Sequence, residues 1–137
     1  MAMRYQRVES PALLNGHEAA RRFFAASFAP DDAATEKLLV AHLDRSAQCI
    51  QLDRFDGKAA SVGLPVRSIV ADAARLGSAG VVLAHNHPSG DARPSMADCR
   101  ATRALSQAGE AIDLTVLDHL IFAADGQCHS MRRMGLL

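Results

Sequence analysis

The sequence predicts an α/β domain in which helices cover the faces of a mixed β-sheet. Apolar residues recur at helical spacing in several segments, and short apolar runs of strand length alternate with them. Several connections are too short for the crossovers that join parallel strands, so we expect part of the sheet to be antiparallel. A length of 137 residues with 49% hydrophobic residues is sufficient for one domain with a single core.

The first predicted element is a helix. Asn15 followed by Glu18 resembles a capping box ahead of the apolar residues at 19–26. A proline and two aspartates at 30–32 then end the helical pattern. We therefore treat residues 1–34 as an N-terminal helical lead-in, and residues 35–137 as the main domain.

A β-hairpin is predicted to follow the lead-in. Residues 38–43 read as an apolar strand, residues 44–46 as a polar turn, and residues 48–52 as the return strand. A further turn and a strand are predicted within residues 56–64.

The middle of the chain alternates between helix and strand. Residues 65–76 have apolar positions at helical spacing, and the continuous apolar run at 81–84 indicates a strand covered on both faces. A turn-rich loop at 88–94 leads into a helix predicted over 95–108. The chain ends with short strands, predicted at 112–116, at 120–123 and around Cys128.

Charge and cysteine content narrow the function classes. The formal net charge is zero, which removes the usual electrostatic argument for non-specific nucleic-acid binding. Because neither a signal peptide nor an apolar run of about 20 residues is visible, we expect a cytoplasmic protein without membrane contacts. The three cysteines lack a Cys-x-x-Cys pair and are predicted to be reduced, buried thiols.

The chemistry-bearing residues begin where the buried strand ends. His85 and His87 are two apart, so on a strand their imidazoles face the same side. Ser95 and Asp98 are three apart at a helix start and share a face of that helix. Two imidazoles and a carboxylate suit Zn²⁺ at about 2.0–2.2 Å, and three ligands leave a fourth position open for water. The spacing therefore predicts a catalytic zinc site of His85, His87 and Asp98.

Hydrolysis also needs a group that transfers protons. Of the four glutamates, Glu36 is the best placed, immediately before the first apolar strand, although spacing alone does not bring it to the metal. Ser95 could donate a hydrogen bond to an oxyanion. Ser95 with Asp98 is also a plausible helix cap, and a lone histidine pair is often a turn anchor. Their joint occurrence behind a buried strand favours the metal site.

Several other polar residues allow simpler interpretations. The adjacent Asp118 and His119 either orient a ligand imidazole or form a satisfied pair at a strand end, and both alternatives stay open. His42 alternates with apolar residues and is predicted to lie at the edge of the core. Asn86 should point away from the metal and brace the loop, and Cys99 should be packed.

The spacing of the ligand residues resembles that of a known family. His-x-His, seven residues, Ser, two residues and Asp is the pattern of the JAMM metalloproteases, also called the JAB/MPN domain. The matching residues are His85, His87, Ser95 and Asp98. The sequence of this stretch resembles the RadC branch of the family most closely. Thr102 and residues 117–119 also match the sequence pattern of that branch. The resemblance covers roughly Glu36 to the C-terminus.

This resemblance implies a three-layer fold similar to that of cytidine deaminases, a zinc ion and Glu36 as general acid/base. It also implies a protein or peptide substrate that is cleaved at an amide or isopeptide bond. RadC proteins are named for DNA repair, so the alternative is a non-catalytic accessory that binds DNA or a repair protein. Thirteen arginines favour this alternative. The zero net charge and the short chain before Glu36, where we expect no helix-hairpin-helix segment, count against it. The oligomeric state is not predicted.

Overall fold

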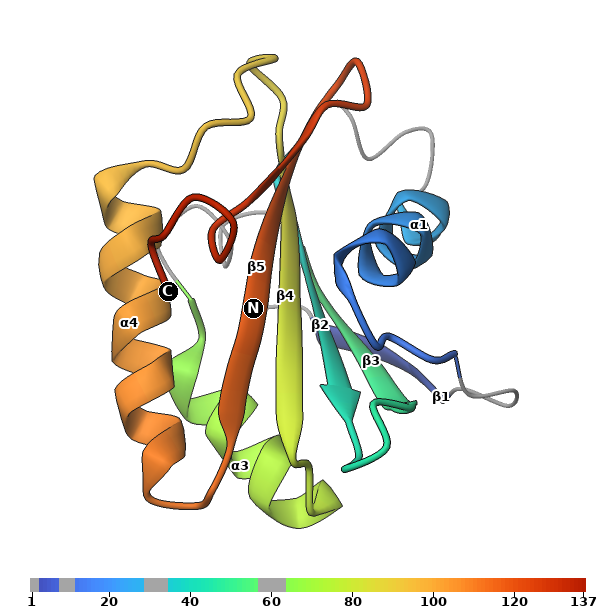
Figure 1. Ribbon diagram of the computed structural model, residues 1–137, viewed down its shortest axis with the longest axis vertical. Coiled ribbons are helices and arrows are strands. Elements are labelled where there is room, and N and C mark those ends of the chain that lie inside the picture. Colours follow the sequence, from blue (N-terminus) through green and yellow to red (C-terminus); the bar gives the residue numbers. More distant parts are fainter. Residues whose placement is uncertain (1–2, 8–11, 29–34, 57–63) are drawn as a thin grey trace.

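A computed structural model of the chain describes residues 3–7, 12–28, 35–56 and 64–137 (Figure 1). It confirms the predicted α/β class. The elements in chain order are β1 (Met3–Arg7), α1 (His17–Ser27), β2 (Lys37–Leu43), β3 (Cys49–Asp56), α3 (Val66–Leu76), β4 (Gly80–His87), α4 (Met96–Glu110), β5 (Thr115–Ala123) and β6 (Cys128–Ser130).

The described strands form one mixed sheet in the order β1-β3-β2-β4-β5-β6. The β4–β5 pair is parallel, and α4 is the crossover that joins the two strands. The other described neighbours pair antiparallel. Short connections predicted this for two of the pairs, β2–β3 and β5–β6. The parallel pair brings the carboxyl end of β4 and the start of α4 to the same edge of the sheet.

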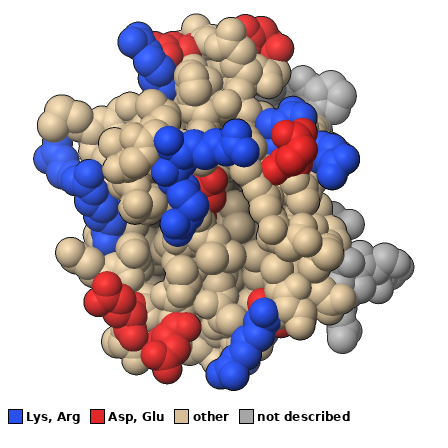
Figure 2. Space-filling model, in the orientation of Figure 1, with Lys and Arg blue, Asp and Glu red and all other residues tan. Residues whose placement is uncertain are grey.

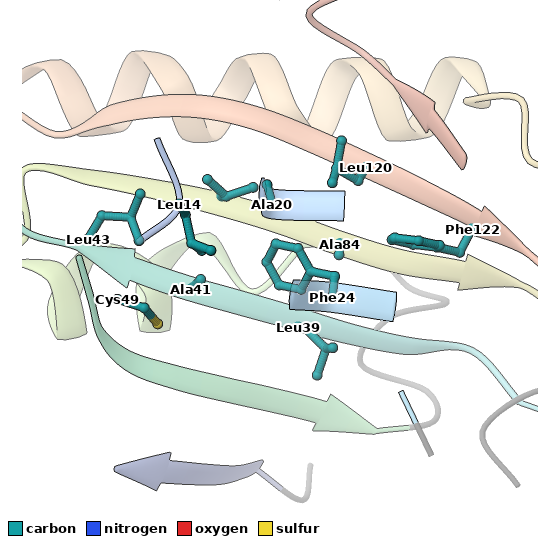
Figure 3. Close-up of a cluster of buried hydrophobic side chains, with 11 residues drawn as sticks. Leu14, Ala20, Phe24, Leu39, Ala41, Leu43, Cys49, Ala84, Leu120 and Phe122 are labelled. Carbon is teal, nitrogen blue, oxygen red and sulfur yellow. The ribbon is translucent and has the colours of Figure 1, made fainter. Parts of the chain in front are cut away.

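Helices cover both faces of the sheet and give three layers (Figure 1). Helix α1 lies on one face, and α3 and α4 lie on the other. The core on the α1 side is shown in Figure 3 and consists of Leu14, Ala20, Phe24, Leu39, Ala41, Leu43, Cys49, Val82, Ala84, Leu120 and Phe122. The core beneath α3 and α4 consists of Leu38, Val40, Phe55, Ile69, Ala73, Val81, Leu83, Leu105, Leu114 and Val116. Strand β4 contributes to both cores, as its continuous apolar run predicted.

The predicted hairpin is confirmed. Strands β2 and β3 pair antiparallel on either side of a turn at Asp44. The Asp44 Oδ1 atom accepts the backbone N–H groups of Ser46 and Gln48 at 2.8 and 3.0 Å, which fixes the turn. The return strand continues to Asp56, further than the sequence predicted.

The N-terminal segment contains the predicted helix, α1, but it also contains a strand. Residues 3–7 form strand β1, which pairs with β3 and was not predicted. The predicted capping box is wrong: Gly16 is the N-cap of α1, without a side-chain cap, and Glu18 bonds Arg21 instead of the backbone of Asn15. The predicted break at 30–32 lies outside the described residues. Residues 57–63, which make up most of the turn and strand predicted within 56–64, also lie outside them.

The prediction of two separate strands at 112–116 and 120–123 was wrong. A single strand, β5, spans Thr115–Ala123, and residues 111–113 form a turn. The polar pair Asp118 and His119 interrupts the apolar pattern, yet both residues are buried inside the strand. Their polar atoms are hydrogen-bonded, which removes the usual penalty for burying them.

The three cysteines differ in their exposure to solvent. All three cysteines are free thiols; Cys49 is buried, whereas Cys99 and Cys128 are partly exposed. Burial was therefore predicted correctly for Cys49 alone. Within the described part of the chain, no helix is long and apolar enough to cross a bilayer.

Candidate metal centre

Two histidines at the carboxyl end of β4 form one side of the site. His85 and His87 face the side of the sheet that α3 and α4 cover, as their two-residue spacing predicted. Their Nε2 atoms are 2.8 Å apart, and their rings are tilted with centroids 4.6 Å apart. His85 is 6% exposed, so it lies in the interior of the domain.

The start of α4 brings a carboxylate to the same point. The Oδ1 atom of Asp98 is 3.6 Å from His85 Nε2, and its Oδ2 atom is 3.5 Å from His87 Nε2. Ser95 is the N-cap of α4 and forms a capping box with Asp98, with bonds of 3.0 and 2.8 Å. The two sequence interpretations are therefore compatible, because the cap fixes the carboxylate that faces the histidines.

A cavity of about 220 Å³ opens in front of these groups. Its polar lining residues are Glu36, His85, His87, Ser95, Asp98 and His119. The residues predicted from the sequence are thus all brought together in one pocket. The structure adds His119, which was predicted only as one of two alternatives.

Asn86 holds the chain on both sides of Glu36. Its Oδ1 atom accepts the backbone N–H of Lys37 at 2.7 Å, and its Nδ2 donates to the carbonyl oxygen of Thr35 at 2.9 Å. Asn86 points away from the two histidines, as predicted. The segment that it braces, however, is the one that contains Glu36.

A buried chain of hydrogen bonds fixes the orientation of His85. Thr102 is fully buried and donates its hydroxyl proton to the carbonyl oxygen of Asp98 at 2.8 Å. Its oxygen therefore accepts the proton of His119 Nδ1, also at 2.8 Å, which leaves His119 Nε2 as an acceptor. His85 Nδ1 lies 2.7 Å from that atom and donates to it. The Nε2 lone pair of His85 is consequently left facing His87 and Asp98.

His87 is oriented by the loop between β4 and α4. Its Nδ1 donates to the carbonyl oxygen of Asp91 at 2.8 Å, so that its Nε2 also presents a lone pair. Two lone pairs that face each other at 2.8 Å repel unless a proton or a metal ion lies between them. The arrangement of hydrogen bonds thus favours a cation at this point.

Burial and charge shift the pKa values of four ionisable groups in different directions. Burial lowers the pKa of His85 to about 4, and it holds the pKa of His119 well below its usual value. Burial alone would raise the pKa of Asp98, but hydrogen bonds from His87 and Ser95 outweigh it and lower that pKa. The hydrogen bond with Asp98 raises the pKa of His87. At neutral pH, Asp98 is therefore a carboxylate and His85 a neutral imidazole.

These properties fit a zinc ion. The ligand atoms of His85, His87 and Asp98 lie within 4.8 Å of one another. Two neutral imidazole nitrogens and a carboxylate oxygen form a donor set that zinc prefers. The Nδ1–H group of each histidine also donates a hydrogen bond to a fixed acceptor, which is the usual arrangement around metal-binding histidines.

The polar pair on β5 lies inside the strand and not at its end, and its two residues have different contacts. His119 orients His85, whereas Asp118 accepts hydrogen bonds from Ser130 and from the backbone of Arg132, so that it anchors the C-terminal segment. Nothing in the spacing predicts this division of roles. It follows from the parallel pairing of β5 with β4, which places His119 beside the ligand strand.

Comparisons with known proteins support the family resemblance that the sequence indicated. A family model described as a RadC-like JAB domain matches residues 14–136. A UPF0758 protein of Bordetella avium is 43% identical over 105 residues, which cover 74% of this chain and 45% of the relative. A UPF0758 protein of Bordetella petrii is 37% identical over 136 residues, which cover 98% of this chain and 56% of the relative.

A third relative shows the same extent of similarity. A UPF0758 protein of Pelodictyon phaeoclathratiforme is 37% identical over 107 residues, which cover 77% of this chain and 48% of the relative. The chain spans about half the length of the curated relatives that it matches. The family match also begins at residue 14, earlier than the resemblance that the sequence alone indicated. On the extent of the family match, the chain belongs to the RadC-like JAB domain family.

Proposed function

We propose that this chain is a zinc-dependent hydrolase of JAMM type that cleaves a peptide or isopeptide bond in a protein or peptide substrate. The observation that supports the proposal most directly is the convergence of two Nε2 lone pairs and the Asp98 carboxylate in one pocket. That pocket is also lined by Glu36, the one glutamate among its lining residues. Ligands and a candidate proton-transfer group therefore share one cavity.

The roles of the residues follow from their positions. Zinc, when bound, lowers the pKa of a coordinated water and polarises the substrate carbonyl. Glu36 accepts the proton of the attacking water and passes it to the leaving nitrogen. Ser95 accepts the backbone N–H of Asp98, which leaves its own hydroxyl proton to stabilise the oxyanion. His119 and Thr102 hold His85 in the tautomer that binds the metal.

The formal net charge of zero counts against binding of DNA. Figure 2 shows basic and acidic side chains interspersed on the face that it presents, without a continuous positive surface among its described residues. A surface that binds a phosphate backbone gathers several lysines or arginines. The alternative of a DNA-binding accessory therefore gains no support from this face.

The proposal is tested by separating metal binding from catalysis. Zinc content is measured by elemental analysis for the wild type, for His87→Ala/Asp98→Asn and for Glu36→Gln. Hydrolysis is measured with quenched fluorescent peptides and ubiquitin-type isopeptide conjugates. We expect Glu36→Gln to retain the zinc of this site and to lose hydrolysis by at least a hundredfold. The ligand double variant should lose both.

Glu110→Gln is the matched control, because Glu110 is an exposed glutamate at the far end of α4. It should hydrolyse the same substrates at the wild-type rate. Full activity in Glu36→Gln would refute the role of Glu36. Full hydrolytic activity in the ligand double variant would refute the zinc mechanism as a whole.

A further inference from the structure

A second group of metal-ligating side chains lies on the same face of the sheet as the first site. His42 on β2, Asp53 on β3 and Asp72 on α3 have ligand atoms within 4.8 Å of one another. His42 pairs in register with Val81, whereas Leu38 pairs with His85. Four residues of strand thus separate the two groups, which is roughly 13 Å. This second group, the α3 cluster, shares no residue with the first site.

The α3 cluster contains polar atoms that are buried without a hydrogen-bond partner. The side chains of His42 and Asp53 are both 0% exposed. His42 Nε2 and Asp53 Oδ2 approach to 3.3 Å, but neither makes a hydrogen bond within the part of the chain that the structure describes. Buried polar atoms are nearly always paired, so two such atoms that approach to 3.3 Å without a hydrogen bond are placed to share a proton or a metal ion.

Neighbouring side chains hold both residues in place from behind. Ser78 Oγ lies 2.9 Å from His42 Nδ1, and a bond at that nitrogen leaves Nε2 to face Asp53. Gln51 Nε2 donates to Asp53 Oδ1 at 2.7 Å, which leaves Oδ2 directed at the histidine. A second ring of hydrogen bonds that orients ligand atoms is characteristic of metal sites.

The α3 cluster brings two carboxylates and one imidazole together. Arg75 contacts Asp72 but not the buried Asp53 in the described part of the chain, and burying charge without compensation is strongly unfavourable. A divalent ion neutralises the carboxylates, and one nitrogen with two oxygens is a donor set that zinc accepts. We propose that His42, Asp53 and Asp72 form a second metal site beneath α3, for a divalent transition-metal ion such as zinc.

Ionisation in the absence of metal is consistent with this proposal. Burial and the neighbouring Asp53 raise the pKa of Asp72. Burial alone would raise the pKa of Asp53, but the neighbouring His42 imidazole and the hydrogen bond from Gln51 outweigh burial and lower that pKa. A proton held between the two carboxylates thus compensates part of the charge that a metal ion would neutralise.

A metal ion can reach the α3 cluster through Asp72. This side chain is 18% exposed and contacts the exposed Arg75 at 3.4 Å, so it lies at the boundary between the cluster and solvent. One carboxylate oxygen can stay with the arginine while the other binds the ion. Helix α3 therefore forms the outer wall of the site, and His42 and Asp53 form its floor on the sheet.

The experiment measures zinc stoichiometry in a background where the first site is removed. His87→Ala/Asp98→Asn serves as that background, since both side chains are partly exposed, at 15% and 21%. Each protein is stripped with chelator, reloaded with zinc alone, desalted and measured by elemental analysis. We expect the wild type to hold about two zinc ions per chain, and the background variant about one.

Asp72→Asn in the background tests the α3 cluster itself. We expect it to lose the remaining zinc and to lose the zinc-induced rise in melting temperature that the background shows. Asp113→Asn is the matched control, because Asp113 is exposed and has a left-handed φ of 55° that asparagine also adopts. Circular dichroism confirms the fold of each variant. Replacing Asp72, which is 18% exposed, disturbs the core less than replacing the fully buried His42.

Two results would overturn the second site. One is a background protein that holds no zinc and shows no zinc-induced stabilisation, which would leave the α3 cluster as a proton-sharing pair. The other is a background protein that keeps its zinc after Asp72→Asn, which would place the ion elsewhere. Neither result depends on hydrolysis, so the second site stands or falls independently of the proposed function.

Discussion

Replacing Thr102 with valine should weaken zinc binding at the first site, although Thr102 does not face the metal ligands. The hydroxyl of Thr102 accepts the proton of His119 Nδ1 at 2.8 Å and donates to the carbonyl oxygen of Asp98. Valine has nearly the same shape and removes both bonds. His119 can then regain a partner only by moving its proton to Nε2, which faces His85. His85 would in turn carry its proton on Nε2, where it blocks the metal.

The size of this effect follows from the burial of the relay. Thr102 is 0% exposed and His119 is 1% exposed, so solvent does not replace the lost partner. Leaving a buried N–H unsatisfied costs about 1–3 kcal/mol. Metal binding must supply this free energy to restore the binding tautomer. We therefore expect the zinc affinity to fall about 10–100-fold, which corresponds to roughly 1.4–2.7 kcal/mol.

The assay is a competition titration of zinc against a chromophoric chelator at neutral pH. Thr102→Ser is the matched control, since it keeps the hydroxyl while losing a methyl group. We expect Thr102→Ser to bind zinc within about threefold of the wild type, a difference of less than 1 kcal/mol. Equal affinities of Thr102→Val and the wild type would refute the relay. A loss in Thr102→Ser as large as that in Thr102→Val would assign the effect to packing.

Three further predictions concern stability and positioning. Burial lowers the pKa of His85 to about 4, so below pH 6.5 the folded metal-free chain binds fewer protons than the unfolded chain. Its free energy of unfolding should fall by on the order of 2 kcal/mol from pH 6.5 to pH 5 in urea titrations; a flat profile would contradict this. Asn86→Ala should speed hydrogen exchange of the Lys37 amide while zinc stoichiometry is retained; unchanged exchange would show that the brace is unimportant. Gly109→Ala should destabilise the domain by about 1–3 kcal/mol in the same titrations, since a Cβ there lies 2.7 Å from the Leu114 carbonyl oxygen; wild-type stability would mean that the helix end shifts freely.

Local sequence signals predicted most of the elements that support the site. The turn at Asp44 is fixed by hydrogen bonds within five residues, so the hairpin can be read from the sequence. The apolar run at 81–84 is covered on both faces, and its composition shows this directly. Strand β1 was missed because its place in the sheet depends on pairing with β3, more than forty residues further along the chain. Such non-local pairing leaves little trace in a short segment.

The sequence could predict that His85, His87, Ser95 and Asp98 lie together, because the two periodicities that position them are local. A strand repeats every two residues and a helix every 3.6. The spacing of His85 and His87 on the strand, and that of Ser95 and Asp98 on the helix, therefore define which side chains face one point. The same periodicity could not predict that His119 supports His85, because this contact joins strands 34 residues apart. The apolar pattern also failed to predict β5 as one strand, because a buried histidine and aspartate look like a break between two apolar strands.

His42 shows the same limit. An isolated histidine between apolar neighbours on a strand reads as a residue at the edge of the core, yet it is fully buried. Its partners come from the next strand and from a helix, and only the folded sheet reveals that Asp53 and Asp72 lie beside it. A buried histidine in an apolar strand therefore requires a compensating group elsewhere in the chain, because an unpaired imidazole would cost several kcal/mol. In this domain both buried histidine sites meet that requirement with carboxylates, which is why both are candidates for a metal ion.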